Sequence, residues 1–289
     1  IAPGKLGHVI ALRDKGCDLK VVVDSVEAAE AVAARNAGIP TLIEIDCDGH
    51  RSGVAPGDAD RLLAIGRALM NGAQLRGVLT HAGGSYSARG AEALARCAEV
   101  ERASVVEAAR TLRAAGLPCP VVSVGSTPTA HFATALDGVT EVRAGVFVFF
   151  DLVMAGIGVC RVDDIALSVL ATVIGHQRDK GWILVDAGWM AMSQDRGPSK
   201  QEKNQGYGVV CDLAGRAYDD VIVGDANQEH GILTVRPGSG AMLPDLAIGD
   251  RVRILPNHAC STAAQHQAYQ VVRGASAAIE AVWPRFGGW

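Results

Sequence analysis

A histidine and a cysteine stand two positions apart near the end of the sequence. The segment 257–262 reads Asn-His-Ala-Cys-Ser-Thr. In an extended segment alternate side chains share one face, so His258 and Cys260 would point the same way. Imidazole nitrogen and thiolate sulfur bind zinc well, and two protein ligands leave positions open for water or substrate. The spacing therefore indicates a candidate divalent metal site, although a buried cysteine beside a capping histidine would give the same pattern.

Two polar loops carry residues that suit a phosphate group. Gly125–Thr129 reads Gly-Ser-Thr-Pro-Thr directly after an apolar run, and Gly83–Ser85 follows another such run. Backbone N–H groups next to glycine, together with serine and threonine hydroxyls, can bind a phosphate. Either loop alone is compatible with an ordinary turn, but two of them on adjacent strand ends favour a phosphate site.

Three further side chains follow expected strands, and each has two readings. Arg51 could face a ligand or satisfy loop carbonyl groups. His81 could be a catalytic group or a histidine satisfied within the core. Tyr86 could donate a hydrogen bond to a ligand or simply close a loop. The residue types and their spacing leave these alternatives open.

The first half of the chain alternates apolar runs with helical patterns. Apolar residues at helical spacing predict a helix over 3–15 and a long one through Leu94, Ala98, Val105, Ala108 and Leu112. The runs predict strands at 19–23, 41–46, 75–80, 120–124 and 139–143. This order is typical of a parallel sheet covered by helices, whose active-site residues follow the carboxyl ends of the strands.

From about residue 163 the pattern changes. Short β-branched segments alternate with Gly, Pro, Asn and Asp, which predicts strands at 165–174, 182–186, 215–223, 232–235 and 251–255. We therefore expect an α/β domain over 1–160 and a β domain over 161–289. A complete (β/α)₈ barrel needs eight strands and about 250 residues. The α/β part offers only four or five, so either the sheet is open or further units precede Ile1.

Composition narrows the class of protein. The 289 residues are 49% hydrophobic and 20% charged with a net charge of −4, which is typical of a globular chain and argues against a nucleic-acid partner. The most apolar stretch, 144–160, contains Asp151 and is shorter than the ~20 residues a membrane span needs. Seven cysteines without a CxxC pair suggest reduced thiols and a cytoplasmic location.

Taken together, nine segments of the sequence resemble the fold type III pyridoxal-phosphate enzymes, in the branch of D-serine dehydratase and D-threonine aldolase. The likeness covers essentially the whole chain. Within the branch, the amino-acid sequences of segments 121–129 and 141–160 are most similar to those of the D-threo-3-hydroxyaspartate dehydratases. The segments are IAPGKL, VVVDS, EIDCDGHRSGV, THAGGSY, VVSVGSTPT, EVRAG, VDAGW, NQEHG and PNHAC.

The resemblance implies a fold and a set of site residues. The expected fold is α/β plus β: a TIM-like (β/α)₈ barrel of the alanine racemase type, followed by a C-terminal β domain. The implied phosphate ligands are Gly125, Ser126 and Thr127, with Tyr86 nearby and Arg51 near the pyridine ring. The resemblance also implies that His258 and Cys260 hold a divalent metal. The thiolate favours zinc over manganese or magnesium.

The implied reaction is β-elimination from a D-3-hydroxy amino acid such as D-serine or D-threo-3-hydroxyaspartate, which gives a keto acid and ammonia. Pyridoxal phosphate would act as the electron sink, and the metal would bind the β-hydroxyl as it leaves. The alternative is a retro-aldol lyase of the D-threonine aldolase type. A homodimer and a small-molecule D-amino acid substrate, with no nucleic-acid or membrane partner, are also expected.

One feature of the family is missing from this sequence. The Schiff-base lysine of the family lies in a segment like Arg-Pro-His-x-Lys-Thr, which does not occur here. We therefore expect that a preceding segment carries the lysine. A non-catalytic cofactor-binding fragment is the alternative for the chain as it stands. The lysines present are Lys5, Lys15, Lys20, Lys180, Lys200 and Lys203.

Overall fold

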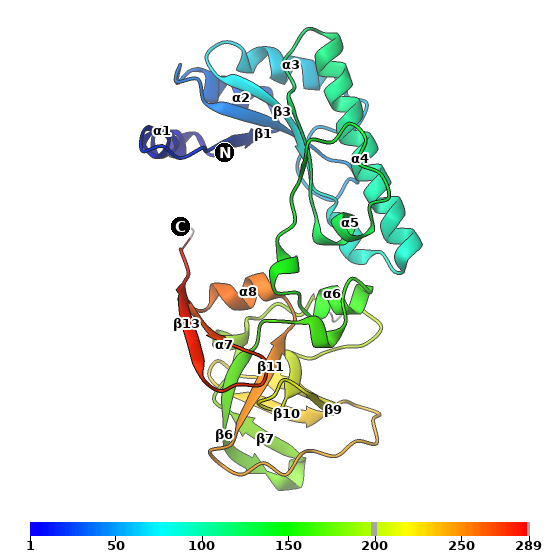
Figure 1. The fold of residues 1–289 in the computed structure, drawn as a ribbon, viewed down its shortest axis with the longest axis vertical. Helices are drawn as coiled ribbons and strands as arrows, with labels where there is room; N and C mark the ends of the chain where they lie inside the picture. Colours follow the sequence, from blue (N-terminus) through cyan, green and yellow to red (C-terminus); the bar gives the residue numbers. More distant parts are fainter. Residues whose placement is uncertain (198–200, 288–289) are drawn as a thin grey trace. The chain divides into compact units, whose positions relative to one another are not determined.

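The computed structural model describes residues 1–197 and 201–287 (Figure 1). The chain forms two compact units, Ile1–Gly145 and Val146–Trp289. The division lies upstream of the boundary at residue 160 that the sequence suggests. The apolar segment just after Gly145 accordingly lies in the second unit.

The first unit is built on a five-stranded parallel sheet. Its strands follow one another in space as they do in the chain, in the order β1-β2-β3-β4-β5, and every neighbouring pair is parallel. All five predicted strands are present. Their consecutive order is that of a (β/α) barrel wall rather than of a sheet whose order reverses. The strands are β1 (Val21–Val23), β2 (Pro40–Ile45), β3 (Gln74–Thr80), β4 (Val121–Val124) and β5 (Glu141–Val142).

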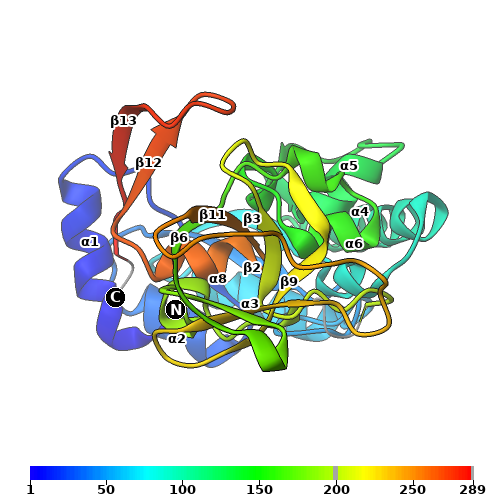
Figure 2. The same ribbon diagram turned by 90° about the horizontal axis from the view of Figure 1, so that it is seen from below.

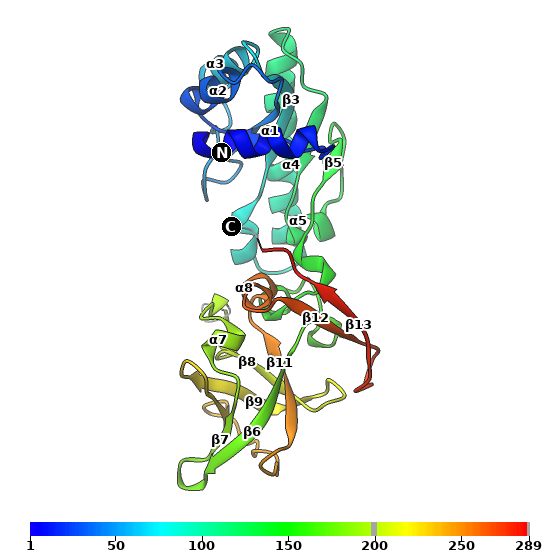
Figure 3. The same ribbon diagram turned by 90° about the vertical axis from the view of Figure 1, so that its left-hand side faces the viewer.

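Helices connect these strands and begin at residues that cap them. The Ser25 side chain accepts a hydrogen bond from the N–H of Ala28, as expected of an N-cap, and Asp58 does the same for Arg61. Helices α2 and α3 lie side by side (Figure 3). The helical elements are η1 (Pro3–Lys5), α1 (Leu6–Asp14), α2 (Val26–Ala33), α3 (Ala59–Leu69), η2 (Gly83–Ser87), α4 (Ala91–Ala114) and α5 (Thr127–Phe132).

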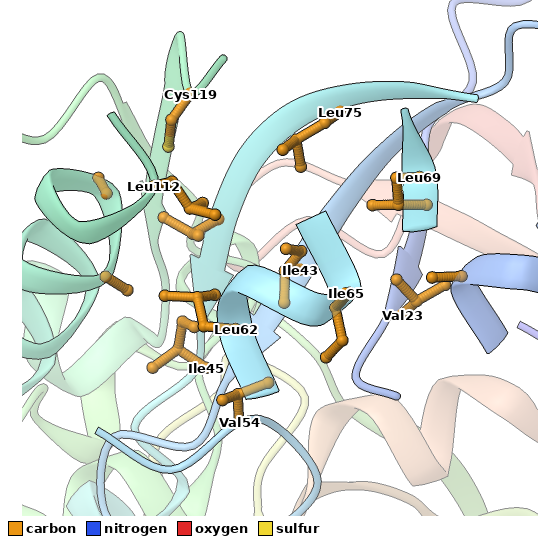
Figure 4. Close-up of a cluster of buried hydrophobic side chains, with 14 of the residues drawn as sticks. Val23, Ile43, Ile45, Val54, Leu62, Ile65, Leu69, Leu75, Leu112 and Cys119 are labelled. Carbon is orange, nitrogen blue, oxygen red and sulfur yellow. The ribbon is translucent and has the colours of Figure 1, made fainter. Parts of the chain in front are cut away.

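The core of this unit lies between the sheet and its helices (Figure 4). Leu62, Ile65 and Leu69 recur at helical spacing along α3, and each is at most 4% exposed. They belong to one buried cluster with Ile43 and Ile45 of β2. Burying a side chain of this kind contributes about 1.5–3 kcal/mol. This packing fixes the strands whose ends carry the candidate residues.

The second unit is mainly a closed antiparallel barrel of six strands, in the order β10-β7-β6-β11-β8-β9. The five strands expected here are present, but β8 was not anticipated because its apolar stretch is only four residues long and opens on glycine. The strands are β6 (Val169–Gln177), β7 (Trp182–Val185), β8 (Gly208–Cys211), β9 (Ala217–Ala226), β10 (Gly231–Val235) and β11 (Arg251–Pro256).

Short helices and a separate hairpin complete the second unit. The hairpin, drawn in red in Figure 2, pairs β12 (Ala268–Val272) with β13 (Ile279–Pro284). The expectation of an all-β region from about residue 163 missed two α-helices, α7 (Trp189–Met192) and α8 (Ala259–Ala264), whereas α6 (Leu152–Ile157) precedes that region. The remaining helical turns are η3 (Val146–Val148), η4 (Val162–Asp164) and η5 (Arg178–Lys180). Among the described residues no helix has the length and apolar character of a membrane span.

Candidate active site

The loop after β4 has the features of an anion-binding turn. Gly125 must be a glycine, because a Cβ there would lie 2.6 Å from the carbonyl oxygen of Arg143. Ser126 caps α5 and accepts a hydrogen bond from the N–H of Thr129. The hydroxyl of Thr127 is buried, yet it has no hydrogen-bond partner among the described residues. A buried hydroxyl without a partner costs free energy, so this atom points to a ligand that is not a protein group.

The loop after β3 adjoins this turn. Ser85 is fully buried, and its hydroxyl lies 3.2 Å from the hydroxyl of Ser126. The N–H of Gly84 donates a hydrogen bond to the carboxylate of Asp48, which lies in the loop after β2. The ends of three consecutive strands are therefore joined at one edge of the sheet.

His81 and Tyr86 form a stacked pair within this edge. Their ring centroids are 6.0 Å apart, and the rings are tilted by 24°. His81 is half-buried. Its pKa is lowered first by burial and then by the positive charge of Arg51. The imidazole is therefore neutral at pH 7 and able to accept a proton.

Arg51 has a different partner from the two considered in the sequence. Its guanidinium lies 3.3 Å from the carboxylate of Glu44 on β2, and Ser52 donates to the same carboxylate. The side chain is half exposed. Arg51 thus stands at the same edge as His81, with its charge partly balanced by Glu44.

Two residues of this edge were missed by the sequence reasoning. Glu101 of α4 is buried and accepts hydrogen bonds from the N–H groups of Ala82 and Gly125. The sequence feature that could have identified Glu101 is a carboxylate among the apolar positions of a predicted helix. Arg143 donates to the Ser123 hydroxyl at 2.8 Å. No pattern in the sequence marks Arg143 as a site residue, because only the tertiary structure brings β5 beside β4.

In the second unit, His258 and Cys260 lie close enough to interact, because Cys260 is the largest cause of the raised pKa of His258. The expected geometry was wrong in one respect. His258 is extended and caps α8, whereas Cys260 already lies in the first turn of that helix. The two side chains meet because the helix begins between them, and not because the segment is a strand.

Asp195 lies behind this pair. Its Oδ2 is 2.6 Å from Nδ1 of His258 and also accepts a hydrogen bond from Ser261. The interaction with Cys260 and the contact with Asp195 outweigh burial and raise the pKa of His258 to about 9. Burial would raise the pKa of Asp195, but the hydrogen bonds it accepts lower it. A carboxylate on one ring nitrogen leaves the other nitrogen for a metal.

Asp151, buried at the start of α6, fixes the helix that carries Cys260. Its two oxygens accept hydrogen bonds from the N–H groups of Met154 and Ala259, so it caps both α6 and α8. Burial raises its pKa. Over residues 1–197 and 201–287 no group of three or more His, Cys, Asp or Glu side chains is arranged to hold a metal. A metal held by His258 and Cys260 alone would keep open positions.

Family models match both units of the chain. The "Alanine racemase, N-terminal domain" model matches residues 7–153, and the "Putative serine dehydratase domain" model matches residues 166–272. The chain is therefore a fold type III pyridoxal-phosphate enzyme, with the alanine racemase-like fold and a C-terminal β domain.

Within that class the chain belongs to the D-serine dehydratase and D-threonine aldolase branch. The D-threo-3-hydroxyaspartate dehydratase of Delftia sp. (strain HT23) is 58% identical over 298 residues, which cover 100% of this chain and 77% of the relative. The solved structure of that enzyme superposes with a TM-score of 0.94, covering 100% of this chain and 78% of the solved one. Two further solved structures of a D-threo-3-hydroxyaspartate dehydratase, each 57% identical to this chain, are a histidine-to-alanine variant and a cysteine-to-alanine variant two positions later, the latter "in the metal-free form".

More distant relatives extend the branch. The D-serine dehydratase of Dictyostelium discoideum is 27% identical over 304 residues, covering 98% of this chain and 75% of the relative. The solved D-threonine aldolase of Filomicrobium marinum is 25% identical, with a TM-score of 0.80 over 98% of this chain and 73% of that one. The chain thus falls among lyases of D-3-hydroxy amino acids.

Proposed function

We propose that the chain acts as a pyridoxal-phosphate- and metal-dependent dehydratase of D-3-hydroxy amino acids, with D-threo-3-hydroxyaspartate as the first substrate to test. The observation that carries this proposal is the His258–Cys260 pair with Asp195 behind it. A Lewis acid is useful where hydroxide must leave, whereas racemisation has no hydroxide to expel. The 58% identical dehydratase supports the choice of substrate.

The fit of the cofactor rests on the first unit. Pyridoxal phosphate, when bound, supplies an electron sink for a carbanion at Cα. The N–H groups of Ser126 and Thr127, which follow Gly125, would hold its phosphate together with the partnerless hydroxyl of Thr127. The Ser126 hydroxyl is instead engaged with Thr129 and Ser85. Tyr86 would close the site, and Arg51 would lie near the pyridine ring. His81, neutral at pH 7, is the candidate to move a proton.

The metal would rest on His258 and Cys260. The chemistry it supplies is polarisation of the β-hydroxyl, which makes hydroxide a better leaving group. Thiolate and imidazole favour zinc over manganese or magnesium. Asp195 would orient the imidazole through Nδ1. The His and Cys variants of the solved D-threo-3-hydroxyaspartate dehydratase, two positions apart as His258 and Cys260 are, support this assignment.

Product analysis tests the proposal. Elimination of water from D-threo-3-hydroxyaspartate leaves an enamine that water hydrolyses to oxaloacetate and ammonia, whereas a retro-aldol cleavage gives glycine and glyoxylate. We expect the first pair from the protein that also carries the family's Schiff-base lysine. The second pair would favour the aldolase alternative. Neither pair, with cofactor bound and no lysine modified by borohydride, would favour the cofactor-binding fragment.

The homodimer is a further part of the proposal. Val282 and Trp283 on β13 are each more than half exposed, and such apolar side chains favour a protein partner. Light scattering of the purified protein distinguishes a dimer from a monomer.

A further inference from the structure

Glu101 is a carboxylate in an apolar position. It lies on α4 between Ala98 and Val105, which are 5% and 0% exposed, and it is itself 2% exposed. A carboxyl group buried to this extent is tolerated only when its oxygens find hydrogen-bond partners. Its partners therefore show what the group does.

One oxygen of Glu101 joins two strand ends. Oε1 accepts the N–H of Ala82 at 3.0 Å and the N–H of Gly125 at 3.1 Å. Ala82 follows β3, and Gly125 follows β4. A single atom thus fixes the spacing of the two loops that carry Ser85, Ser126 and Thr127.

The other oxygen begins a row of hydroxyl groups. Oε2 lies 2.6 Å from Oγ1 of Thr129, which lies 2.8 Å from Oγ of Ser126. Oγ of Ser126 lies 3.2 Å from Oγ of Ser85, which lies 2.7 Å from the carbonyl oxygen of Ala82. The row starts at Glu101 and ends on the backbone beside the first loop.

The protons of this row can be counted. Four oxygen–oxygen contacts link Glu101, Thr129, Ser126, Ser85 and the Ala82 carbonyl, but three hydroxyl groups bring only three protons. If Glu101 is ionised, one contact must bring two lone pairs together. If Glu101 is a carboxylic acid, its O–H donates to Thr129, and each hydroxyl donates to the next group as far as the carbonyl.

We propose that Glu101 is a positioning residue, held as a neutral carboxylic acid, that orders the Ser85–Ser126–Thr129 hydroxyls and fixes the distance between the two cofactor loops. The inference rests on the proposed function, because it takes these loops to hold the phosphate. A neutral acid also adds no negative charge beside that anion.

The surroundings of Glu101 agree with a neutral acid. Burial is the largest influence and raises its pKa, while the hydrogen bonds from Thr129, Ala82 and Gly125 lower it less. The positive charge that acts on it is that of Arg143, and this effect is smaller still. The nearby thiols of Cys47 and Cys97 have raised pKa values and are neutral at pH 7.

Glutamine distinguishes the two protonation states. In Glu101→Gln the amide oxygen can accept both N–H groups and the amide N–H can donate to Thr129, as the neutral acid would. Glu101→Ala removes all three contacts. Glu107→Gln, on the exposed side of α4, is the matched control. The readouts are calorimetric titrations with pyridoxal phosphate and with pyridoxal, plus the melting temperature.

The expected result is specific to the phosphate. Glu101→Gln and Glu107→Gln should bind pyridoxal phosphate as the parent does, and Glu101→Ala should bind it about tenfold more weakly with little change for pyridoxal. Equal losses for both ligands in Glu101→Ala, or a Glu101→Gln variant as weak as Glu101→Ala, would overturn the inference. A parent protein that binds pyridoxal phosphate no better than pyridoxal would instead overturn the proposed phosphate site.

Two measurements guard against a variant that fails to fold. Thr129→Val keeps Glu101 but interrupts the row, and it should also weaken pyridoxal phosphate selectively; no change would count against the row. Infrared difference spectra between the parent and Glu101→Gln at pH 7 should show the C=O band of a carboxylic acid. A carboxylate band in its place would contradict the neutral state.

Discussion

Nδ1 of His258 lies 2.6 Å from Oδ2 of Asp195, 63 residues earlier in the chain. The contact holds the imidazole in one orientation and fixes which nitrogen remains for a ligand. Asp195 is itself held, because its other oxygen accepts the N–H of Gly197. The orientation of the proposed metal ligand is therefore set by a loop distant in sequence.

Replacing Asp195 should weaken metal binding without removing a ligand. We expect Asp195→Ala to lower zinc affinity about 10- to 100-fold, the range typical of lost outer-shell partners. Chelator competition measures the change, and Asp245→Ala, at an exposed site, is the control. Unchanged affinity in Asp195→Ala would show that the contact does not orient a ligand.

Replacing Cys260 should alter which metal is preferred. Cys260→Ser exchanges a soft thiolate for a hydroxyl, so zinc affinity should fall more than manganese or magnesium affinity. The metal content of protein purified with each ion checks this outcome. Cys17→Ser, at an exposed cysteine of the first unit, should leave metal content unchanged. Equal zinc in both variants would exclude Cys260 as a ligand.

Removing the Thr127 hydroxyl should weaken cofactor binding. Thr127→Val keeps the shape but removes the partnerless oxygen, and a hydrogen bond to a charged group contributes about 1.5–3 kcal/mol. We expect about a tenfold or larger rise in the Kd of pyridoxal phosphate, measured calorimetrically. Thr134→Val, at an exposed site beyond α5, serves as the control. A melting temperature at least equal to that of the parent would separate lost binding from lost folding.

Asp220 should make the second unit sensitive to acid. Its carboxylate contacts Lys203 at 2.9 Å and Arg236 at 3.0 Å, and these partners hold its pKa well below the usual range. A carboxyl with a lowered folded pKa contributes stability above its unfolded pKa of about 4, and this contribution is lost as the pH falls through the folded value.

Asp220→Asn removes the charge and keeps a residue type that tolerates its φ of 48°. We expect a lower melting temperature than the parent at pH 7 and a smaller difference as the pH falls below about 4. Thermal melts across that range measure both. Asp225→Asn, on the same strand but exposed, should show neither effect. A difference that does not change with pH would assign the loss to packing.

The sequence predicts much of the fold because its patterns are local. Apolar runs such as those of β3 and β4 are followed by glycine and hydroxyl residues, and parallel strands bring their carboxyl ends to one edge. That logic predicts that the Gly83–Ser85 and Gly125–Thr129 loops lie on adjacent strand ends, and the contact between Ser85 and Ser126 agrees with it. It failed for β8, where four residues are too few to show a period, and for α8, where a helix was taken for extended chain.

What the sequence by itself determined is the set of chemical groups: the His-x-Cys pair, the two hydroxyl-rich loops, and the order of strands that carries them. Only the tertiary structure decided which groups support them. Glu101 meets Gly125 across 24 residues and Asp195 meets His258 across 63, because packing against the sheet and the barrel closes those distances. No local period records such contacts. The reacting groups can therefore be read from the chain, but the residues that orient them cannot.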